Sequence, residues 1–527
     1  MRLHLTPGYV RPWSRSGGTW ARGSAVAPDG AVLEGAELAA WLDGPAGRLA
    51  DRVRLLSGTF AAVCDDGAAV ALAADRIRSI PLVYGRDAAG AWCASDDGRW
   101  LARAVGARLD RPVAAAEYLL QGCVVGPDSL SSSVQGVQAA EVVVLTGAGA
   151  NSVRYARYAD GPRLDGSPDE LEAEGVRGLD RAFERLLASV RGRPVAVPLS
   201  GGIDSRLVAA MFVRGGRTDA VCYTYGRARS FEARASRRVA RALGLRWRFV
   251  PYGYRDWHRW AQTDAYQRYR RTAGGLVSIE HEQDWPAVAA LRQRGELEPG
   301  AVVVPGHAGD FLGGSHLSPS PGLGSAEGIV GRYYHEWPRH GLSPETAGTL
   351  AARVRAQLDG AEGAPALLRF GWQERQAKVI AHSVRVYEDH GLDWRLPFWA
   401  DADVVDFWGR VPTPLLHGRR LYDRVLRRML GGMADLPSTL GRRDVLAGAL
   451  RRRADADLRR YGMWLGPSPL TGALRLRVGD LARLDHPVVG PVAEALVRPV
   501  ARGRLSAATV NGLLALDQLG DLARELG

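Results

Sequence analysis

The segment from Pro194 to Phe212 constrains the fold of this chain more than any other. Its first part, Pro194 to Leu199, has the apolar character of a buried strand, and its last part is typical of a helix. Between them lies the string Leu199-Ser200-Gly201-Gly202-Ile203-Asp204-Ser205. Glycines let a backbone approach a phosphate, and serine hydroxyls and helix N-terminal amides donate hydrogen bonds to it. The string therefore predicts a phosphate-binding turn, and it differs from the Walker pattern because no GKS or GKT occurs.

Strand-like and helix-like segments alternate after this turn. Ala220 to Tyr225 and Arg246 to Val250 have the pattern of strands, and Phe231 to Leu243 between them has the pattern of a helix. Such alternation predicts an α/β fold with a parallel, doubly wound sheet, which binds ligands at the carboxyl ends of its strands. Upstream, Ser167-Pro168-Asp169-Glu170 predicts a capped helix start. From about residue 341 onward the chain has a mainly helical pattern.

The first 160 residues have a different pattern, with short β-like runs between turn residues. The runs are Gly58 to Val63, Ala69 to Ala73, Pro81 to Tyr84, Ala91 to Ser95 and Glu141 to Leu145. A turn-rich stretch without periodicity, residues 159–166, separates them from the capped helix. We therefore predict a mainly β, layered domain over residues 1–160 and a second domain over residues 167–527.

The basic charge of the chain comes almost entirely from arginine. The 527 residues carry a formal charge of +12, and Lys378 is the one lysine. Clustered basic residues would indicate binding to nucleic acid or a membrane surface. Here the arginines are spread along the chain among Asp and Glu, so we favour a codon bias toward arginine and predict neither partner. Four cysteines without a CxxC pair, and no long apolar run, predict a cytoplasmic protein.

The Leu199 to Ser205 string resembles the pyrophosphatase loop of ligases that cleave ATP between its α and β phosphates. These ligases include asparagine synthetases, β-lactam synthetases, lasso-peptide cyclases, argininosuccinate synthetase and tRNA lysidine synthetase. The resemblance implies that ATP activates a carboxylate or carbonyl as an adenylate and that pyrophosphate is released. It implies ATP-binding roles for Leu199, Ser200, Gly201, Gly202, Asp204 and Ser205.

A second glycine-containing segment, Val302 to Gly314, resembles the second loop of these enzymes, whose aspartate holds magnesium. The resemblance implies that Asp310 and Asp204 bind Mg²⁺, and that Gly306, His307 and Gly309 help to bind ATP. Two carboxylates, completed by water and substrate phosphates, suit the preference of Mg²⁺ for oxygen ligands.

The first domain resembles the glutamine amidotransferase half of asparagine synthetases, an Ntn-type fold. The likeness rests on Gly58 to Val63, Ala74 to Tyr84 and Ala94-Ser95-Asp96. In that family the nucleophile is a cysteine at position two, whereas this sequence has Arg2 and no cysteine before Cys64. Glutamine hydrolysis therefore lacks its nucleophile, which argues against asparagine synthesis.

The segment from Glu374 to Trp408 resembles lasso-peptide cyclases most. Its distinctive parts are Glu374 to Lys378, Ser383 to Glu388 and Asp393 to Trp399. The resemblance implies a macrolactam cyclase that joins an Asp or Glu side chain of a precursor peptide to the N-terminal amine of that peptide. It also implies a separately encoded leader-binding protein and leader peptidase. Glu388 is the best match for the family glutamate that faces the acyl acceptor, and Tyr387 is its predicted catalytic neighbour.

The related synthetases use a lysine near the C-terminus, and this chain has none after Lys378. Either Lys378 takes that catalytic role or an arginine replaces it, with Arg419, Arg420, Arg442 and Arg443 as candidates. Three other functions stay open: an amide ligase of the β-lactam or asparagine synthetase type, a tRNA-modifying ligase, and a peptide-binding scaffold without chemistry.

Overall fold

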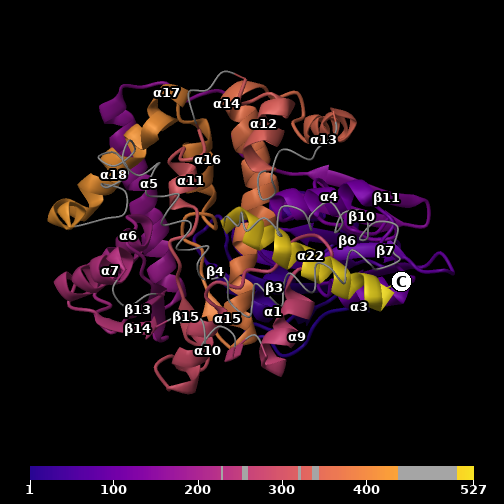
Figure 1. Cartoon of the computed structure of the whole chain (residues 1–527), viewed down its shortest axis with the longest axis horizontal. Coiled ribbons are helices and arrows are strands. Elements are labelled where there is room, and N and C mark those ends of the chain that lie inside the picture. The colour runs from indigo at the N-terminus through magenta and orange to yellow at the C-terminus, as the bar shows by residue number, and fades with distance from the viewer. Residues whose placement is uncertain are drawn as a thin grey trace, which may run out of the picture.

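The computed structural model describes residues 1–226, 230–251, 259–260, 262–317, 322–334, 344–436 and 507–526. Its centre is a five-stranded sheet whose neighbouring strands are all parallel. The strands are β12 (Val195–Pro198), β13 (Val221–Gly226), β14 (Arg246–Pro251), β15 (Val302–Val303) and β16 (Asp393–Trp394). The predicted parallel α/β sheet is confirmed, and Figure 1 shows α6 and α7 beside β13 and β14.

The order of the strands places a binding crevice next to β12. The strand order is β14-β13-β12-β15-β16. After β12 the chain adds β13 and β14 on one side of it, and then β15 and β16 on the other side. At such a switch point the loops that follow the two central strands diverge and leave a crevice at their carboxyl ends. The loops after β12 and β15 are the two segments that the sequence predicts to bind ATP and magnesium.

Local sequence signals account for the helices around the sheet. Helix α5 (Pro168–Ser189) begins with the predicted capping box, in which the Ser167 and Glu170 side chains each accept a backbone N–H of the other. The helices on and near the sheet are α6 (Asp204–Arg214), α7 (Phe231–Ala242), α9 (Asp264–Ala273), α10 (Trp285–Gln293), α11 (Gly309–Leu312) and α15 (Arg385–Asp389).

The described residues after 341 are mainly helical, as predicted. They form α13 (Pro344–Ala356), α14 (Gly363–Phe370), the π-helical segment η3 (Gly371–Ile380), the short 3-10 helix η4 (Ala381–Val384), α16 (Ala402–Arg410), α17 (Thr413–Leu416), α18 (Arg420–Leu430) and α22 (Ala507–Leu526), and α12 (Ala326–Tyr333) precedes them. Trp394, Trp399 and Trp408 are almost completely buried in the core. No described helix has both the length and the apolar character needed to cross a membrane.

The first 160 residues form two sheets, which confirms their mainly β character. One sheet has the order β1 (Arg2–His4), β8, β7, β9 (Gln135–Gly136). The other has the order β11 (Gly149–Arg154), β10, β6, β5, β3, β2 (Ser14–Ser16), with β4 (Val32–Glu34) paired to β3. The predicted strands are β5 (Ser57–Asp65), β6 (Val70–Ala74), β7 (Val83–Arg86), β8 (Trp92–Ser95) and β10 (Glu141–Thr146). Four elements were not predicted from the sequence: α1 (Gly35–Leu42), α3 (Gly98–Val105), α4 (Pro112–Gln121) and the long strand β3 (Thr19–Val26). The domain boundaries and the amidotransferase likeness stay predictions.

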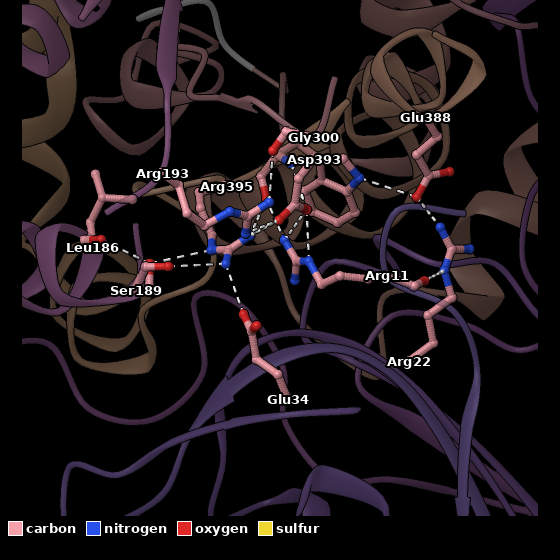
Figure 2. Close-up of polar contacts among 11 residues, drawn as sticks. Arg11, Arg22, Glu34, Leu186, Ser189, Arg193, Gly300, Glu388, Asp393 and Arg395 are labelled. Atoms are coloured by element: carbon pink, nitrogen blue, oxygen red, sulfur yellow. Dashed lines mark hydrogen bonds and ion pairs between the residues drawn. The ribbon is translucent and has the colours of Figure 1, made fainter. Parts of the chain in front are cut away.

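Charged side chains join these first sheets to the parallel sheet (Figure 2). The buried Asp393 carboxylate accepts hydrogen bonds from Arg11 (2.7 Å), Arg193 (2.5 Å) and Arg395 (2.9 Å). Arg395 also donates to Glu34, at 2.8 Å. Because Arg193 lies two residues before β12 and Asp393 is the first residue of β16, this network lies at the amino ends of the parallel strands, away from the two loops at their carboxyl ends.

Candidate active site

The first loop is organised by its own serines. The Ser205 hydroxyl accepts the backbone N–H of Ser200 at 3.0 Å, and the two hydroxyls lie 3.0 Å apart. The Gly202 N–H donates to the Ser200 hydroxyl at 3.1 Å. Helix α6 starts directly after the loop, and its N-cap residue Ile203 provides no side-chain acceptor. Uncapped amides at a helix start suit a phosphate, as the sequence predicted for this loop.

A carboxylate contacts the same loop, although the sequence analysis did not identify it. Burial raises the pKa of Glu232, and a hydrogen bond from the Gly201 backbone N–H opposes that rise. Glu232 lies in the first turn of α7, which follows β13. Leu199 at the other side of the loop is buried, and its N–H donates to the Tyr223 carbonyl of β13 at 2.8 Å.

The second loop packs directly onto the first through two glycines. A Cβ on Gly306 would lie 2.4 Å from the backbone nitrogen of Ser205. A Cβ on Gly309 would lie 2.7 Å from a carboxylate oxygen of Asp204 and 2.3 Å from the Tyr422 hydroxyl. No side chain fits in these spaces, so the two glycines are needed for close approach of the loops.

The two predicted metal ligands are Asp204 in the first loop and Asp310 in the second. Because the loops are in contact, the charge of Asp310 acts on Asp204. Burial raises the pKa of Asp204 to about 7; Arg419 lowers it, and the nearby negative charge of Asp310 raises it. The Tyr422 hydroxyl donates to Asp204 at 2.6 Å, and the Ser315 hydroxyl donates to Asp310 at 3.0 Å. Two carboxylates that disfavour each other's charge form a donor set that fits Mg²⁺, with water and phosphate oxygens as its remaining ligands.

We expect magnesium binding to weaken as the pH falls through 7. Because the pKa of Asp204 is raised to about 7, a proton competes with the metal for this carboxylate in neutral solution. Below pH 7 the apparent affinity should fall up to about tenfold per pH unit. Isothermal titration of Mg²⁺ in the presence of a non-hydrolysable ATP analogue, from pH 6 to 8, measures this. A Mg²⁺ affinity that does not change between pH 6 and 8 would contradict the prediction.

Arg419 is the basic residue that lies beside the acid pair. Its charge acts on both Asp204 and Asp310, its side chain is buried, and its guanidinium bonds to Asp423. Arg420 is exposed, while Arg442 and Arg443 lie outside the described residues. Of the described candidates for the missing lysine, Arg419 has the position that fits. Tyr422, one turn further along α18, is a site residue that no local sequence signal indicated.

The hydrogen bonds of Lys378 argue against that role. Its side chain is completely buried in η3, and its ammonium donates to the carbonyls of Val124 (2.8 Å) and Gly126 (2.6 Å) and to the Glu374 carboxylate (2.7 Å). An ammonium has three hydrogens, and all three are used inside the protein. These bonds join η3 to residues 124–126 and argue against the catalytic role predicted for Lys378, which stays a prediction.

Glu388 also has a position that differs from the one predicted. Its carboxylate is ion-paired with Arg22 of β3 and with Arg385 (3.0 Å), and it accepts the indole N–H of Trp394 at 3.1 Å. Figure 2 shows the side chain directed toward the first domain. Because its oxygens are bonded to Arg22, Arg385 and Trp394, the carboxylate is directed away from the two loops, which argues against Glu388 as the general base.

We expect Glu388→Gln to lower stability more than activity. The change removes a buried ion pair but keeps a polar side chain, which should cost about 1–3 kcal/mol of unfolding free energy. ATP turnover per folded molecule should stay within about threefold, whereas loss of a general base lowers rates by about 10²–10⁴. Thermal unfolding and initial rates on the same preparation measure both. A 100-fold slower enzyme with an unchanged melting temperature would restore the original assignment.

Tyr387 does face the loops, through an aspartate that the sequence analysis missed. Its buried hydroxyl donates to Asp284 at 3.0 Å. Ser383, one helical turn earlier, bonds to Nδ1 of His307 at 2.9 Å. Burial lowers the pKa of His307 to about 4, so its imidazole is neutral at pH 7. Asp284 belongs to no recognisable sequence motif, and only the fold brings it close to Tyr387.

Comparison with protein families gives one match. Residues 177–256 match the asparagine synthase family. The matched segment extends from within α5 past β14 and includes the first loop. The match supports an asparagine synthetase-like, ATP-dependent amide ligase. No curated protein matches the chain.

Several solved structures show a weak likeness. NMN synthetase from Francisella tularensis is 15% identical, with a TM-score of 0.21, over 41% of this chain and 97% of that one. NH3-dependent NAD synthetase from Campylobacter jejuni is 14% identical, with a TM-score of 0.19, over 36% of this chain and 95% of that one. A glutamine phosphoribosylpyrophosphate amidotransferase from B. subtilis is 10% identical, with a TM-score of 0.20, over 56% of this chain and 64% of that one. Scores this low support no conclusion about this chain.

Proposed function

We propose that this protein is an ATP- and Mg²⁺-dependent lasso-peptide cyclase. The observation that carries the ligase chemistry is the contact between the two loops, which brings Asp204 and Asp310 together at the carboxyl edge of the sheet. The asparagine synthase match over the first loop supports the same chemistry. The peptide substrate is proposed from the resemblance of residues 374–408 to lasso-peptide cyclases.

The state of the cysteines supports a reaction in which the attacking amine belongs to the substrate and is not ammonia released from glutamine. All four cysteines are free and buried. Burial raises the pKa of Cys123 and of Cys222 to about 12, which keeps both thiols protonated. A buried, protonated thiol does not attack glutamine, because the thiolate is the nucleophile. None of them is placed to generate ammonia, and a peptide N-terminal amine takes its place.

Each side chain then has a role in adenylation of the substrate carboxylate. That carboxylate attacks the α-phosphate of ATP, and the α6 amides with the Ser200 and Ser205 hydroxyls bind the departing pyrophosphate. The fixed positive charge of Arg419 stabilises the negative charge that develops beside it. When bound by Asp204 and Asp310, Mg²⁺ supplies Lewis-acid stabilisation of the phosphate oxygens.

The test is ATP-dependent loss of water from a peptide. Linear peptides with a free N-terminal amine and one Asp or Glu at successive positions are incubated with the protein, ATP and Mg²⁺. The expected products are AMP, pyrophosphate and a peptide that is lighter by one water and resists aminopeptidase. The same peptides with an acetylated N-terminus are the matched control. If none of the peptides loses water, while small amino acids stimulate pyrophosphate release, a small-molecule amide ligase replaces this proposal.

A further inference from the structure

We propose that His281, oriented by Asp284, is the catalytic base that accepts the proton of the attacking amine. This inference rests on the proposed function, since it assigns a residue to its second step. His281 lies outside both glycine loops and belongs to no sequence motif identified above. It lies in the irregular segment between α9 and α10, and the fold brings it beside the second loop.

The first observation is a histidine and an aspartate in direct contact. The Nε2 atom of His281 lies 2.8 Å from a carboxylate oxygen of Asp284. Tyr387 donates to the other oxygen at 3.0 Å, and Tyr225 donates to the first at 3.3 Å. Burial tends to raise the pKa of Asp284, but the hydrogen bonds and charges of His281 and its neighbours hold it below its usual value. Asp284 is therefore a fixed anion that can stabilise a protonated imidazole.

The second observation is the location of the pair. The ring centroids of His281 and His307 are 6.3 Å apart. His307 directly follows Gly306, which contacts the backbone of Ser205, and it comes three residues before Asp310. Tyr225 lies near the carboxyl end of β13. The pair is therefore next to the edge of the sheet where the adenylate would form.

The third observation is the free nitrogen of His281. A carboxylate only accepts hydrogen bonds, so the hydrogen of neutral His281 lies on Nε2 and the lone pair lies on Nδ1. Among the residues that the structure describes, none bonds to Nδ1, and a fifth of the side chain is exposed. The neighbouring Glu280 and Glu282 turn away and bind Arg270 of α9. A positioned lone pair at an accessible atom is what a general base requires.

The other polar groups nearby fit this role less well. The Tyr387 hydroxyl donates to Asp284 and is completely buried, so it acts as a positioning residue. His307 bonds to a serine instead of a carboxylate, and burial lowers its pKa to about 4. Glu388 is neutralised by arginines.

The step balances without any further reactant. The neutral α-amine of the peptide attacks the acyl carbon of the adenylate and forms the C–N bond. The proton of the nitrogen passes to Nδ1 of His281, the bond from the acyl carbon to the phosphate oxygen breaks, and AMP leaves with its electron pair. The imidazolium then returns this proton to solvent, to which a fifth of the side chain is exposed.

The experiment separates the two half-reactions in His281→Gln. Pyrophosphate exchange into ATP reports adenylation, and mass spectrometry of the linear peptides described above reports cyclisation. We expect exchange within about threefold of the wild-type rate and cyclisation slower by about 10²–10⁴. Hydroxylamine is a weaker base than an alkyl amine, so its adduct loses a proton to water without a positioned base, and it should still form a peptide hydroxamate at close to the wild-type rate. Asp284→Asn should reduce cyclisation in the same way, and His4→Gln in the first domain is the matched control.

Each outcome has a defined consequence. Cyclisation at the wild-type rate in folded His281→Gln would overturn the inference and leave the proposed function standing. Equal loss of exchange and cyclisation would also overturn it, because the residue would then act in adenylation or in the fold. Thermal melting shows whether each variant is folded, and a misfolded His281→Gln is replaced by His281→Asn. If the wild-type protein neither exchanges pyrophosphate nor cyclises any peptide, the proposed function itself fails.

Discussion

Asp204→Asn should abolish nearly all ATP-dependent activity, with a fall in pyrophosphate release of at least about 10²–10³-fold. The substitution keeps the size of the side chain and an oxygen for the Tyr422 hydroxyl, but it removes the negative charge that we propose binds Mg²⁺ together with Asp310. Loss of one well-placed electrostatic group in an active site has an effect of this size. Initial rates of pyrophosphate release at saturating Mg²⁺ measure it.

The same variant should be at least as stable as the wild-type protein when Mg²⁺ is absent. The pKa of Asp204 is raised in the folded protein, so ionisation of this carboxyl destabilises the fold as the pH rises through 7. Asparagine carries no such charge. The melting temperature at pH 8 without metal should therefore stay equal or rise. Asp180→Asn, which alters a surface ion pair with Arg214, is the control for removal of an aspartate. A less stable and inactive Asp204→Asn would indicate a structural role.

Lys378→Met should destabilise the protein by about 3–5 kcal/mol, the usual cost when one partner of a buried ion pair is removed. Lys378 and Glu374 are both completely buried. Without the ammonium, the Glu374 carboxylate keeps only the Gly126 backbone N–H as a donor among the bonds described, and the carbonyls of Val124 and Gly126 lose their partner. The midpoint of urea unfolding measures the loss.

The double variant Lys378→Met with Glu374→Gln tests this explanation. It leaves no buried charge at this position, so it should recover part of the stability that the single variant loses. Lys378→Arg should also be less stable, because a planar guanidinium does not place three donors toward two carbonyls and a carboxylate as a compact ammonium does. A Lys378→Met protein of wild-type stability with no ligase activity would return the lysine to the active site.

Local signals in the sequence were sufficient for the fold between residues 167 and 251. The alternation of apolar runs predicted β12, α6, β13, α7 and β14, and Ser167 with Glu170 predicted the capped start of α5. The glycine loops were also recognisable, because phosphate binding needs particular residues at adjacent positions. Short helices such as α3 and α4 were missed, since their patterns are brief and lie between strands.

The assignment of individual residues needed the tertiary structure. Glu388 and Tyr387 are adjacent in a helix, yet successive side chains on a helix point about 100° apart. One of them meets Arg22 in the first domain and the other meets Asp284 near the loops. From the sequence alone both were candidates for the same role.

The sequence by itself predicted the parallel sheet, which the structure confirms, and a phosphate-binding loop with an aspartate after one of its strands, because those signals are local. Only the tertiary structure decided which distant residues complete that site. Tyr422 and Arg419 reach Asp204 across more than two hundred residues of chain, Asp284 meets Tyr387, and His281 lies beside His307. It also showed that the ammonium of the one lysine, Lys378, is buried and bonded to Glu374 and to the carbonyls of Val124 and Gly126. Contacts of this kind depend on packing between elements, and a single sequence contains no local pattern that reports them.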